Sequence, residues 1–414
     1  MAEKHTTGEP AALATVVRVA TPGETRGLER VVLILGLPAL LLFLGVLLPM
    51  HIFSGGGEAG APPVVDFAVF WMAGRMALAG DAPLSYDWTT FAAAQSATFT
   101  QDFAPGGLPW LNPPSFPLLL APLATLSYPW AWLVWSVFSV ALAVVAARAV
   151  LPRWSAGVAF LIAPGSIFSL LLGQNGLVTA SLLGLALALM DKRPIAAGVF
   201  LGLLSYKPQF GLLFPILLAA TGRWRVFFAA AATVITLVLV SGLAFGVGSW
   251  AAFLGAIGPI AGLMEAGAAV IVEFQSVRAI LVGQGVPGSM ASAAHAGIAL
   301  ASAALAVLLW KAAGPDRDEA AAAATLAALF LATPYSLPYD TTILALACVF
   351  LARAGLRDGA LPGELAFGFG ACLLTALPLW LDTHAAGAWA AAILLALAVR
   401  RGLAHRIPLA GNRI

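Results

Sequence analysis

Long apolar segments follow one another through almost the whole chain, from Val31 to Val399. They constrain the fold more than any other feature, because about 20 consecutive apolar residues are enough to cross a bilayer as a helix. Of the 414 residues, 61% are hydrophobic and only 10% are charged, whereas a soluble domain carries roughly 25% charged residues. The sequence therefore excludes a soluble globular protein and predicts an all-α, polytopic integral membrane protein.

The lysines and arginines form seven clusters along the chain, and these predict how it crosses the membrane. Cytoplasmic loops collect Lys and Arg, so we place all seven clusters on one side. The clusters are Arg26 and Arg30, Arg148 and Arg153, Lys192 and Arg193, Arg223 and Arg225, Lys311 and Arg317, Arg353 and Arg357, and Arg400 and Arg401. The resulting path has both termini inside and twelve crossings, at 31–50, 130–150, 155–172, 176–190, 194–206, 208–221, 225–247, 289–311, 319–333, 338–353, 364–381 and 386–399.

This path divides the chain into a cytoplasmic tail at 1–30, one transmembrane domain at 31–399 and a second cytoplasmic tail at 400–414. Residues 52–112 form a large outer loop, in which we expect an interfacial helix. Residues 113–126 are apolar but contain four prolines, and counting them as a crossing would reverse every later loop. We therefore interpret 113–126 as a re-entrant or interfacial segment.

Two pairs of glycines, Gly198/Gly202 and Gly242/Gly246, have the four-residue spacing that lets membrane helices approach closely. We expect each pair to face a neighbouring helix.

Asp66 is the first candidate for chemistry. It precedes an apolar helix that we expect to lie on the membrane, and its carboxylate could serve as a general base at the water–bilayer boundary. The alternative role is an N-cap, in which the carboxylate satisfies free backbone N–H groups. Further along the same loop, Tyr86 and Trp88 flank Asp87 and could stack on a sugar ring, although interfacial aromatic residues are expected in any membrane protein.

Lys207 is the residue hardest to explain by structure alone. It lies between two short apolar segments, directly before Pro208, and a cation in such a place indicates a functional site. It could bind a phosphate or pyrophosphate, or it could be a lysine that reaches to the membrane surface. Arg278 is the second candidate for phosphate binding, although Glu273 could simply pair with it.

Other polar side chains complete the predicted outer rim of the site, and for these a role in loop capping is the alternative. They are Arg75, Gln174, Asn175, Gln209, Gln275, Tyr339, Asp340 and His384. The sequence has no Walker A, dinucleotide-binding or HExxH motif. It has no basic stripe either, so we expect no nucleic-acid partner. We expect no cofactor and assign no metal ligands, and the sequence leaves open whether the protein requires a divalent metal.

Several of these residues belong to short motifs that resemble those of glycosyltransferase family 87, in the same order along the chain. They are Asp66-Phe67 with Trp71, Ala73-Gly74-Arg75, Gly80-Asp81-Ala82-Pro83, Tyr86-Asp87, Asn112-Pro113-Pro114, Gly173-Gln174-Asn175-Gly176, Lys207-Pro208-Gln209 and Pro338-Tyr339-Asp340.

The resemblance implies a GT-C-fold membrane enzyme that uses a polyprenyl-phosphate sugar, with mannose as the sugar favoured by the family and a lipid or glycan as acceptor. It also implies Asp66 as catalytic base, Lys207 near the donor phosphate, and a site on the outer face of a bacterial-type inner membrane. Some relatives have a histidine in the loop before Tyr339. Here Tyr335, Ser336 and Leu337 occupy that loop, and His384 is a distant substitute.

A transporter or lipid flippase is the competing interpretation, because many crossings and short broken helices suit that class as well. Against it, the two halves of the chain show no repeat, and a carrier would not need so long an outer loop.

Overall fold

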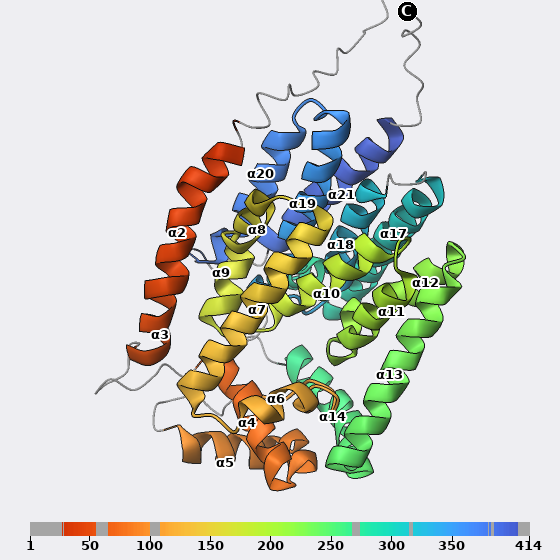
Figure 1. The fold of residues 1–414 in the computed structure, drawn as a ribbon. Coiled ribbons are helices and arrows are strands. Elements are labelled where there is room, and N and C mark those ends of the chain that lie inside the picture. The colour runs from red at the N-terminus through yellow and green to blue at the C-terminus, as the bar shows by residue number, and fades with distance from the viewer. Residues whose placement is uncertain are drawn as a thin grey trace, which may run out of the picture.

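The structure is a computed structural model that describes residues 27, 29–54, 65–99, 108–266, 274–313, 318–379, 381 and 385–404. Every regular element in these ranges is a helix (Figure 1). The predicted all-α, polytopic class is confirmed. Of the predicted tails 1–30 and 400–414, only residues 27, 29, 30 and 400–404 are described, and residues 29, 30 and 400–404 extend the first and last spans.

Six described helices are long and apolar enough to cross a membrane. They are Glu29–Phe53, which includes α2 (Leu37–Leu42) and α3 (Leu48–Ser54), α7 (Tyr128–Val150), α13 (Trp224–Phe245), α17 (Gly288–Ala312), Pro338–Asp358, which includes α19 (Thr342–Asp358), and α21 (Ala386–Ala404). A seventh span results if α8 (Trp154–Leu161) and α9 (Pro164–Leu171), which are bent by 63° to each other, count as one.

The other predicted crossings coincide with shorter apolar helices. These are α10 (Gly176–Leu189), α11 (Pro194–Leu203), α12 (Leu213–Ala220), α18 (Glu319–Ala332) and α20 (Glu364–Leu374). The twelve predicted segments thus all fall on helices, but half of them lack the length of a simple membrane-spanning helix.

Two of the short helices, α10 and α18, lie in the interior. Almost every residue of α10 and α18 is buried, whereas only 17% of the first span and 11% of α13 are buried inside the protein. Irregular backbone at membrane depth is tolerated where protein covers it. The helices α10 and α18 can therefore end early. Three loops adjoin the ends of short helices, at residues 172–176, 204–212 and 333–341, and we name them the interior loops because each contains a buried polar residue, Asn175, Lys207 and Asp340 respectively.

The predicted outer loop forms one end of the molecule, with α4 (Phe67–Ala79), the 3-10 helix η4 (Ala82–Tyr86) and α5 (Trp88–Thr98) (Figure 1). The helix expected after Asp66 is present as α4. It does not lie on the surface, because ten of its thirteen residues are buried and α6 (Pro117–Leu123) packs closely against Gly74. With seven residues, α6 is too short to cross a bilayer, so segment 113–126 is not a thirteenth span.

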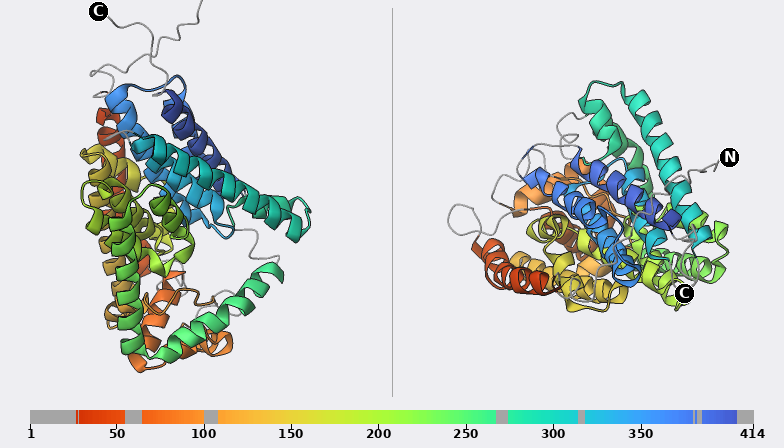
Figure 2. Two further views of the ribbon diagram at one scale, coloured as in Figure 1. Left: turned by 90° about the vertical axis from the view of Figure 1, so that its right-hand side faces the viewer. Right: turned by 90° about the horizontal axis from the view of Figure 1, so that it is seen from above.

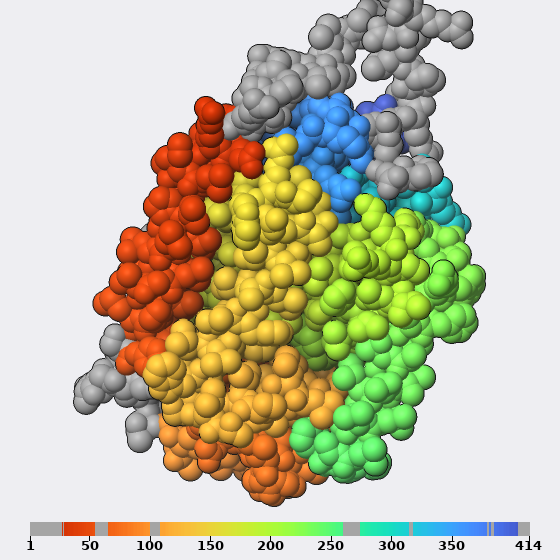
Figure 3. Space-filling view, viewed as in Figure 1, coloured from red at the N-terminus to blue at the C-terminus, as the bar shows by residue number. Residues whose placement is uncertain are grey.

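Helix α14 (Val247–Ala266) packs on the outer loop and was not predicted as an element. In the turned view, α14 and α17 extend away from the body of the bundle on the same side (Figure 2). The space-filling view shows the outer loop, in orange, meeting the green surface of α13 and α14 at the lower end (Figure 3).

The described members of the basic clusters gather at the opposite end, as the charge pattern predicts. Contacts between the ends of different helices join them. These contacts are Arg153 with Glu29, Arg353 with the carbonyl of Val150 and with Glu319, Arg223 with Asp191 and with the ring of Trp310, Arg357 with Glu319, and Arg401 with Glu364. The molecule therefore has a basic end and, away from it, the end formed by the outer loop.

The two glycine pairs behave differently. A Cβ atom at Gly198 would lie 2.5 Å from the Cβ of Ala229, and one at Gly202 would lie 2.4 Å from the Cβ of Thr233. This pair lets α11 and α13 pack in close contact, as predicted. The prediction for Gly242 and Gly246 is wrong, because a Cβ at either position would meet no described atom within 4 Å.

This difference gives a matched test of packing. Gly202→Leu should destabilise the protein by about 1–3 kcal/mol, because overpacking forces the two helices apart. Gly242→Leu places the same side chain in open space and should leave the stability near that of the wild type. Thermal unfolding in detergent, followed by size-exclusion chromatography, measures both variants, and equal melting temperatures would contradict the close contact between α11 and α13.

Candidate functional site

Asp66 is held at the start of α4 by the first interior loop. The backbone N–H of Phe67 donates a 3.0 Å hydrogen bond to the carbonyl of Leu172. Gly173 has a φ of +63°, and a Cβ there would lie 2.5 Å from the Cβ of Phe67. Only glycine fits at position 173, because both its backbone conformation and its packing exclude a side chain.

The carboxylate of Asp66 does not cap α4, so the N-cap alternative is wrong. Instead, Gln174 donates a 3.0 Å hydrogen bond from Nε2 to Oδ2 of Asp66. The other amide atom of Gln174, Oε1, accepts a 3.3 Å hydrogen bond from the backbone N–H of Asn175. The half-buried carboxylate is thus oriented by a side chain that is itself held in place.

The first interior loop also packs on the third. A Cβ on Gly176 would lie 2.2 Å from the carbonyl oxygen of Tyr339. The hydroxyl of Thr342 donates 2.9 and 3.0 Å hydrogen bonds to the carbonyls of Gly176 and Tyr339. These contacts fix the loop at 172–176 to the 3-10 helix η7 (Pro338–Thr341) at the entry of α19.

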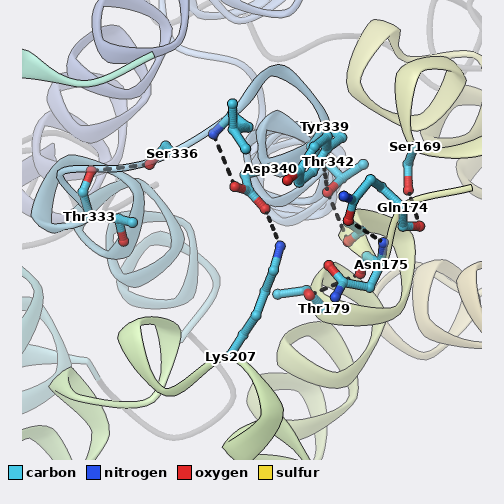
Figure 4. Close-up of polar contacts among 12 residues, drawn as sticks. Ser169, Gln174, Asn175, Thr179, Lys207, Thr333, Ser336, Tyr339, Asp340 and Thr342 are labelled. Atoms are coloured by element: carbon cyan, nitrogen blue, oxygen red, sulfur yellow. Dashed lines mark hydrogen bonds and ion pairs between the residues drawn. The ribbon is translucent and has the colours of Figure 1, made fainter. Parts of the chain in front are cut away.

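Lys207 and Asp340 form a buried ion pair next to this junction (Figure 4). Nζ of Lys207 lies 2.6 Å from Oδ1 of Asp340, and both residues are buried. Oδ2 of Asp340 accepts a 3.0 Å hydrogen bond from the backbone N–H of Leu337. The lysine therefore does not extend to the membrane surface. The carboxylate of Asp340 both pairs with Lys207 and caps η7.

The chain breaks at Lys207 because of the proline that follows it. Lys207 has φ and ψ of −126° and 72°, outside the helical region, since a residue before proline is driven out of that region. Two 3-10 turns, η5 (Leu204–Tyr206) and η6 (Pro208–Phe210), flank it. The break turns the lysine side chain toward Asp340 and over the ring of Tyr339, whose centroid is 5.0 Å from Nζ.

A short chain of hydrogen bonds joins the two halves of the site. The hydroxyl of Thr179 donates to the carbonyl of Asn175 at 2.9 Å and lies 2.8 Å from the hydroxyl of Tyr206, the neighbour of Lys207. We name this set the interior polar cluster: Asp66, Gln174, Asn175, Thr179, Tyr206, Lys207 and Asp340. Its residues come from the three interior loops, from α10 and, for Asp66, from the start of α4.

The side-chain amide of Asn175 is unusual within this cluster. Asn175 is 1% exposed, and neither its Oδ1 nor its Nδ2 has a hydrogen-bond partner among the described residues. A buried amide without partners costs about 1–3 kcal/mol for each unsatisfied group. Such a group in a native protein calls for an explanation, and a functional role is one.

Arg278 and Gln275 lie around the third interior loop, away from these hydrogen bonds. Nε of Arg278 donates to Ser292 at 3.0 Å, and the guanidinium lies 6.0 Å from the ring centroid of Tyr335. The backbone N–H of Gln275 donates a 2.7 Å hydrogen bond to the carbonyl of Ser336, and Oε1 of Gln275 accepts a 3.2 Å hydrogen bond from the backbone N–H of Gly387. Glu273, considered above as the partner of Arg278, lies outside the described residues.

The other predicted site residues do not join the interior polar cluster through a described contact. Arg75 is exposed and lies over the ring of Trp71. The hydroxyl of Tyr86 donates to the carbonyl of Asn112 at 2.8 Å, and Gln209 is exposed. His384 lies outside the described residues.

Asp87 is the N-cap of α5, where its Oδ1 accepts a 2.8 Å hydrogen bond from the backbone N–H of Thr90. Hydrogen bonds from Thr90 lower the pKa of this exposed carboxyl below its usual value. Asp87 is therefore a charged group at neutral pH, at the outer end of the molecule.

Sequence reasoning missed Thr179, Tyr206 and His295. A threonine and a tyrosine in apolar helices give little signal, because such residues commonly bond to nearby backbone. His295, on α17, is buried, and its Nε2 lies 3.2 Å from the carbonyl of Ala332 at the end of α18. Ala332 directly precedes the loop at 333–341, in which some relatives were expected to have a histidine.

The fold and the interior polar cluster define a polytopic membrane protein with a buried carboxylate–lysine site. Among the described residues, no three His, Cys, Asp or Glu side chains are grouped so that they could hold a metal ion. The sequence model of glycosyltransferase family 87 matches residues 110–334, more than half of the chain, and includes Gln174 and Lys207. The chain belongs to this family, and it is a membrane glycosyltransferase. No curated protein and no solved structure matches it.

The buried ion pair can be tested by stability. Lys207→Met leaves the carboxylate of Asp340 buried without its cation, which should cost about 3–5 kcal/mol. Asp191→Asn is the matched control, because it breaks the pair with Arg223, in which the Asp191 side chain is 57% exposed, and such pairs contribute about 1 kcal/mol or less. Equal melting temperatures for the two variants would contradict the buried pair.

Asn175 gives a test that separates a functional from a structural role. Asn175→Leu replaces the unsatisfied amide by an apolar group of similar size, so it should raise the free energy of unfolding by about 1 kcal/mol or more. The same change should reduce glycosyl transfer at least tenfold. A melting temperature and a transfer rate measured on one preparation decide this, and a variant that is less stable but fully active would indicate a structural amide.

Proposed function

We propose that the chain transfers a sugar from a polyprenyl-phosphate donor to a hydroxyl group of a lipid or glycan acceptor, with Asp66 as general base. The observation that carries the proposal is the position of this carboxylate. It is half-buried, it does not cap its helix, and Gln174 holds it within the interior polar cluster of a family 87 glycosyltransferase.

The chemistry needs few protein groups because a sugar on a lipid phosphate is already activated. Asp66 takes the proton of the acceptor hydroxyl while that oxygen attacks the anomeric carbon. The bond between the anomeric carbon and the phosphate oxygen breaks, and the lipid phosphate leaves with the electron pair. A single displacement of this kind inverts the configuration of the anomeric carbon. The hydrogen bond from Gln174 keeps the base oriented, which is the positioning that such a step requires.

Lys207 is proposed to steady the leaving phosphate. An ammonium group has three donors, of which one points to Asp340. A phosphate beside Lys207 would receive the others, and Asp340 would neutralise the lysine before the donor binds. Arg278 is the second proposed cation. Its guanidinium lies near the ring of Tyr335, which belongs to the same interior loop, 333–341, as Asp340. Asn175, Tyr339 and Gln275 are proposed to contact the substrate, because they belong to the cluster or to the loops around it.

The proposed orientation follows from charge. Because lysines and arginines are retained on the cytoplasmic side, the basic end would face the cytoplasm and the outer loop the opposite side. The reaction would then take place on the outer face of a bacterial-type inner membrane. Mannose is the proposed sugar, on the resemblance to family members that use polyprenyl-phosphate mannose.

Asp66→Asn tests the proposal most simply. Asparagine keeps an acceptor for Gln174 but cannot take a proton, so the transfer rate should fall about 10²–10⁴-fold with the melting temperature unchanged. The purified protein is incubated with radiolabelled polyprenyl-phosphate sugars and membrane lipids, and labelled product is counted. Asp81→Asn, an exposed residue of the same loop, is the control and should keep full activity.

Full transfer by a folded Asp66→Asn protein would exclude this residue as the base. Movement of the donor across a vesicle membrane without any labelled product would instead support a flippase.

A further inference from the structure

A cleft of about 400 Å³ opens between the outer loop and α14. This volume is within the range of sites for small molecules, roughly 300–1,000 Å³. One wall contains Tyr86, Asp87, Trp88 and Trp110, and the other is a face of α14. We name it the outer cleft. It lies at the end of the molecule remote from the basic clusters.

Aromatic rings dominate the first wall. Trp88 is 41% exposed, and Trp110 forms the inner surface with 2% exposure. Tyr86 is held by its hydrogen bond to Asn112 and by an edge-on contact with Phe253 of α14, at 5.7 Å between ring centroids. Rigid rings of this kind offer flat, electron-rich faces at little cost in side-chain entropy.

The opposite wall is flat and lacks bulky side chains. Ala252, Gly255, Ala256 and Pro259 line the cleft, and their spacing puts all four on one face of α14. The larger residues Leu254 and Ile257 are exposed and do not line the cleft. The cleft therefore lies between aromatic rings and a helix face of small residues, so the C–H face of a sugar ring can stack on the aromatic wall.

The charge of the outer cleft excludes the donor phosphate. Asp87 is the only charged residue among those that line it, and the carboxylate would repel a phosphate. Toward a neutral sugar the same carboxylate is favourable, because it accepts hydrogen bonds from hydroxyl groups. Binding of a polyprenyl chain without a sugar would be unfavourable, because its apolar surface would lie against the charged carboxylate of Asp87.

The outer cleft is joined to the catalytic candidate by packing. The ring of Trp110 contacts Phe70 edge-on at 6.3 Å between centroids, and Phe70 lies one helical turn after Asp66 on α4. Tyr86 and Asp87 follow α4 directly through η4. The aromatic wall of the cleft is thus packed on the helix that begins directly after Asp66.

We infer that the outer cleft binds the neutral carbohydrate part of the acceptor, stacked on Trp88 beside Asp87, while the reacting hydroxyl extends toward Asp66. This inference rests on the proposed function and adds to it that the acceptor is a glycan or glycolipid with sugar residues beyond the reacting one.

Saturation-transfer NMR on the full chain in nanodiscs tests this. The probes are three neutral trisaccharides, mannotriose, maltotriose and cellotriose, and farnesyl phosphate serves as the anionic lipid probe. At least one trisaccharide should show transfer to its ring protons. Trp88→Ala should weaken the binding of that sugar about tenfold, which corresponds to 1.4 kcal/mol. Trp154→Ala changes a tryptophan at the basic end that is even more exposed, at 64%. It is the control and should leave sugar binding unchanged.

Asp87→Asn is a second variant. Asparagine caps a helix as well as aspartate does, so the fold is kept and sugar binding should weaken through the lost charge. Each of three results would overturn the inference: no trisaccharide signal with wild-type protein, equal binding to the wild-type and Trp88→Ala proteins, or loss of farnesyl phosphate binding alone in Trp88→Ala. Because binding is measured without turnover, it should be the same in Asp66→Asn protein. A failure of the proposed base therefore remains distinguishable from a failure of the cleft.

Discussion

A lysine can stay charged in the interior of a membrane protein when a carboxylate lies beside it, and the pair of Lys207 and Asp340 meets this requirement. The pair joins the break between α11 and α12 to the entry of α19, two places where the backbone leaves regular helix. Since removing one partner would leave an uncompensated buried charge, the ion pair keeps these two loops together. The first interior loop, and with it Asp66, is then fixed through Gly176 and Thr342.

The sequence predicted the fold class and the location of the twelve apolar segments, because hydrophobic runs and basic loops are local signals. It did not predict helix length. Segments such as α10 and α18 end early because neighbouring helices cover their ends, and the sequence of a segment does not reveal its neighbours. The two glycine pairs show the same limit, because they have the same spacing but different surroundings. A Cβ at Gly202 would clash with Thr233 of α13, whereas a Cβ at Gly242 would meet no described atom within 4 Å.

Asp66, Gln174, Asn175, Lys207 and Asp340 were all singled out from the sequence, because polar residues among apolar ones are conspicuous. Their pairing was not predicted: Gln174 is 108 positions from Asp66, and Asp340 is 133 positions from Lys207. Conversely, Thr179 and Tyr206 escaped notice because their hydroxyls look like ordinary helix residues until the fold brings them together. Tyr86 and Asp87 were predicted to contact a sugar, and they line a cleft that is separate from the interior polar cluster. That separation suggests a division of labour, with cations and the base in the interior and aromatic rings at the outer end.

The central claim is that Asp66 and Lys207 belong to one donor site. A structure of the chain with a polyprenyl-phosphate sugar bound tests it most directly. The account predicts the phosphate beside the ammonium of Lys207, and the anomeric carbon close enough to Asp66 for a single acceptor oxygen to lie between them. A phosphate bound at the basic end or in the outer cleft, with Lys207 still paired only to Asp340, would contradict it.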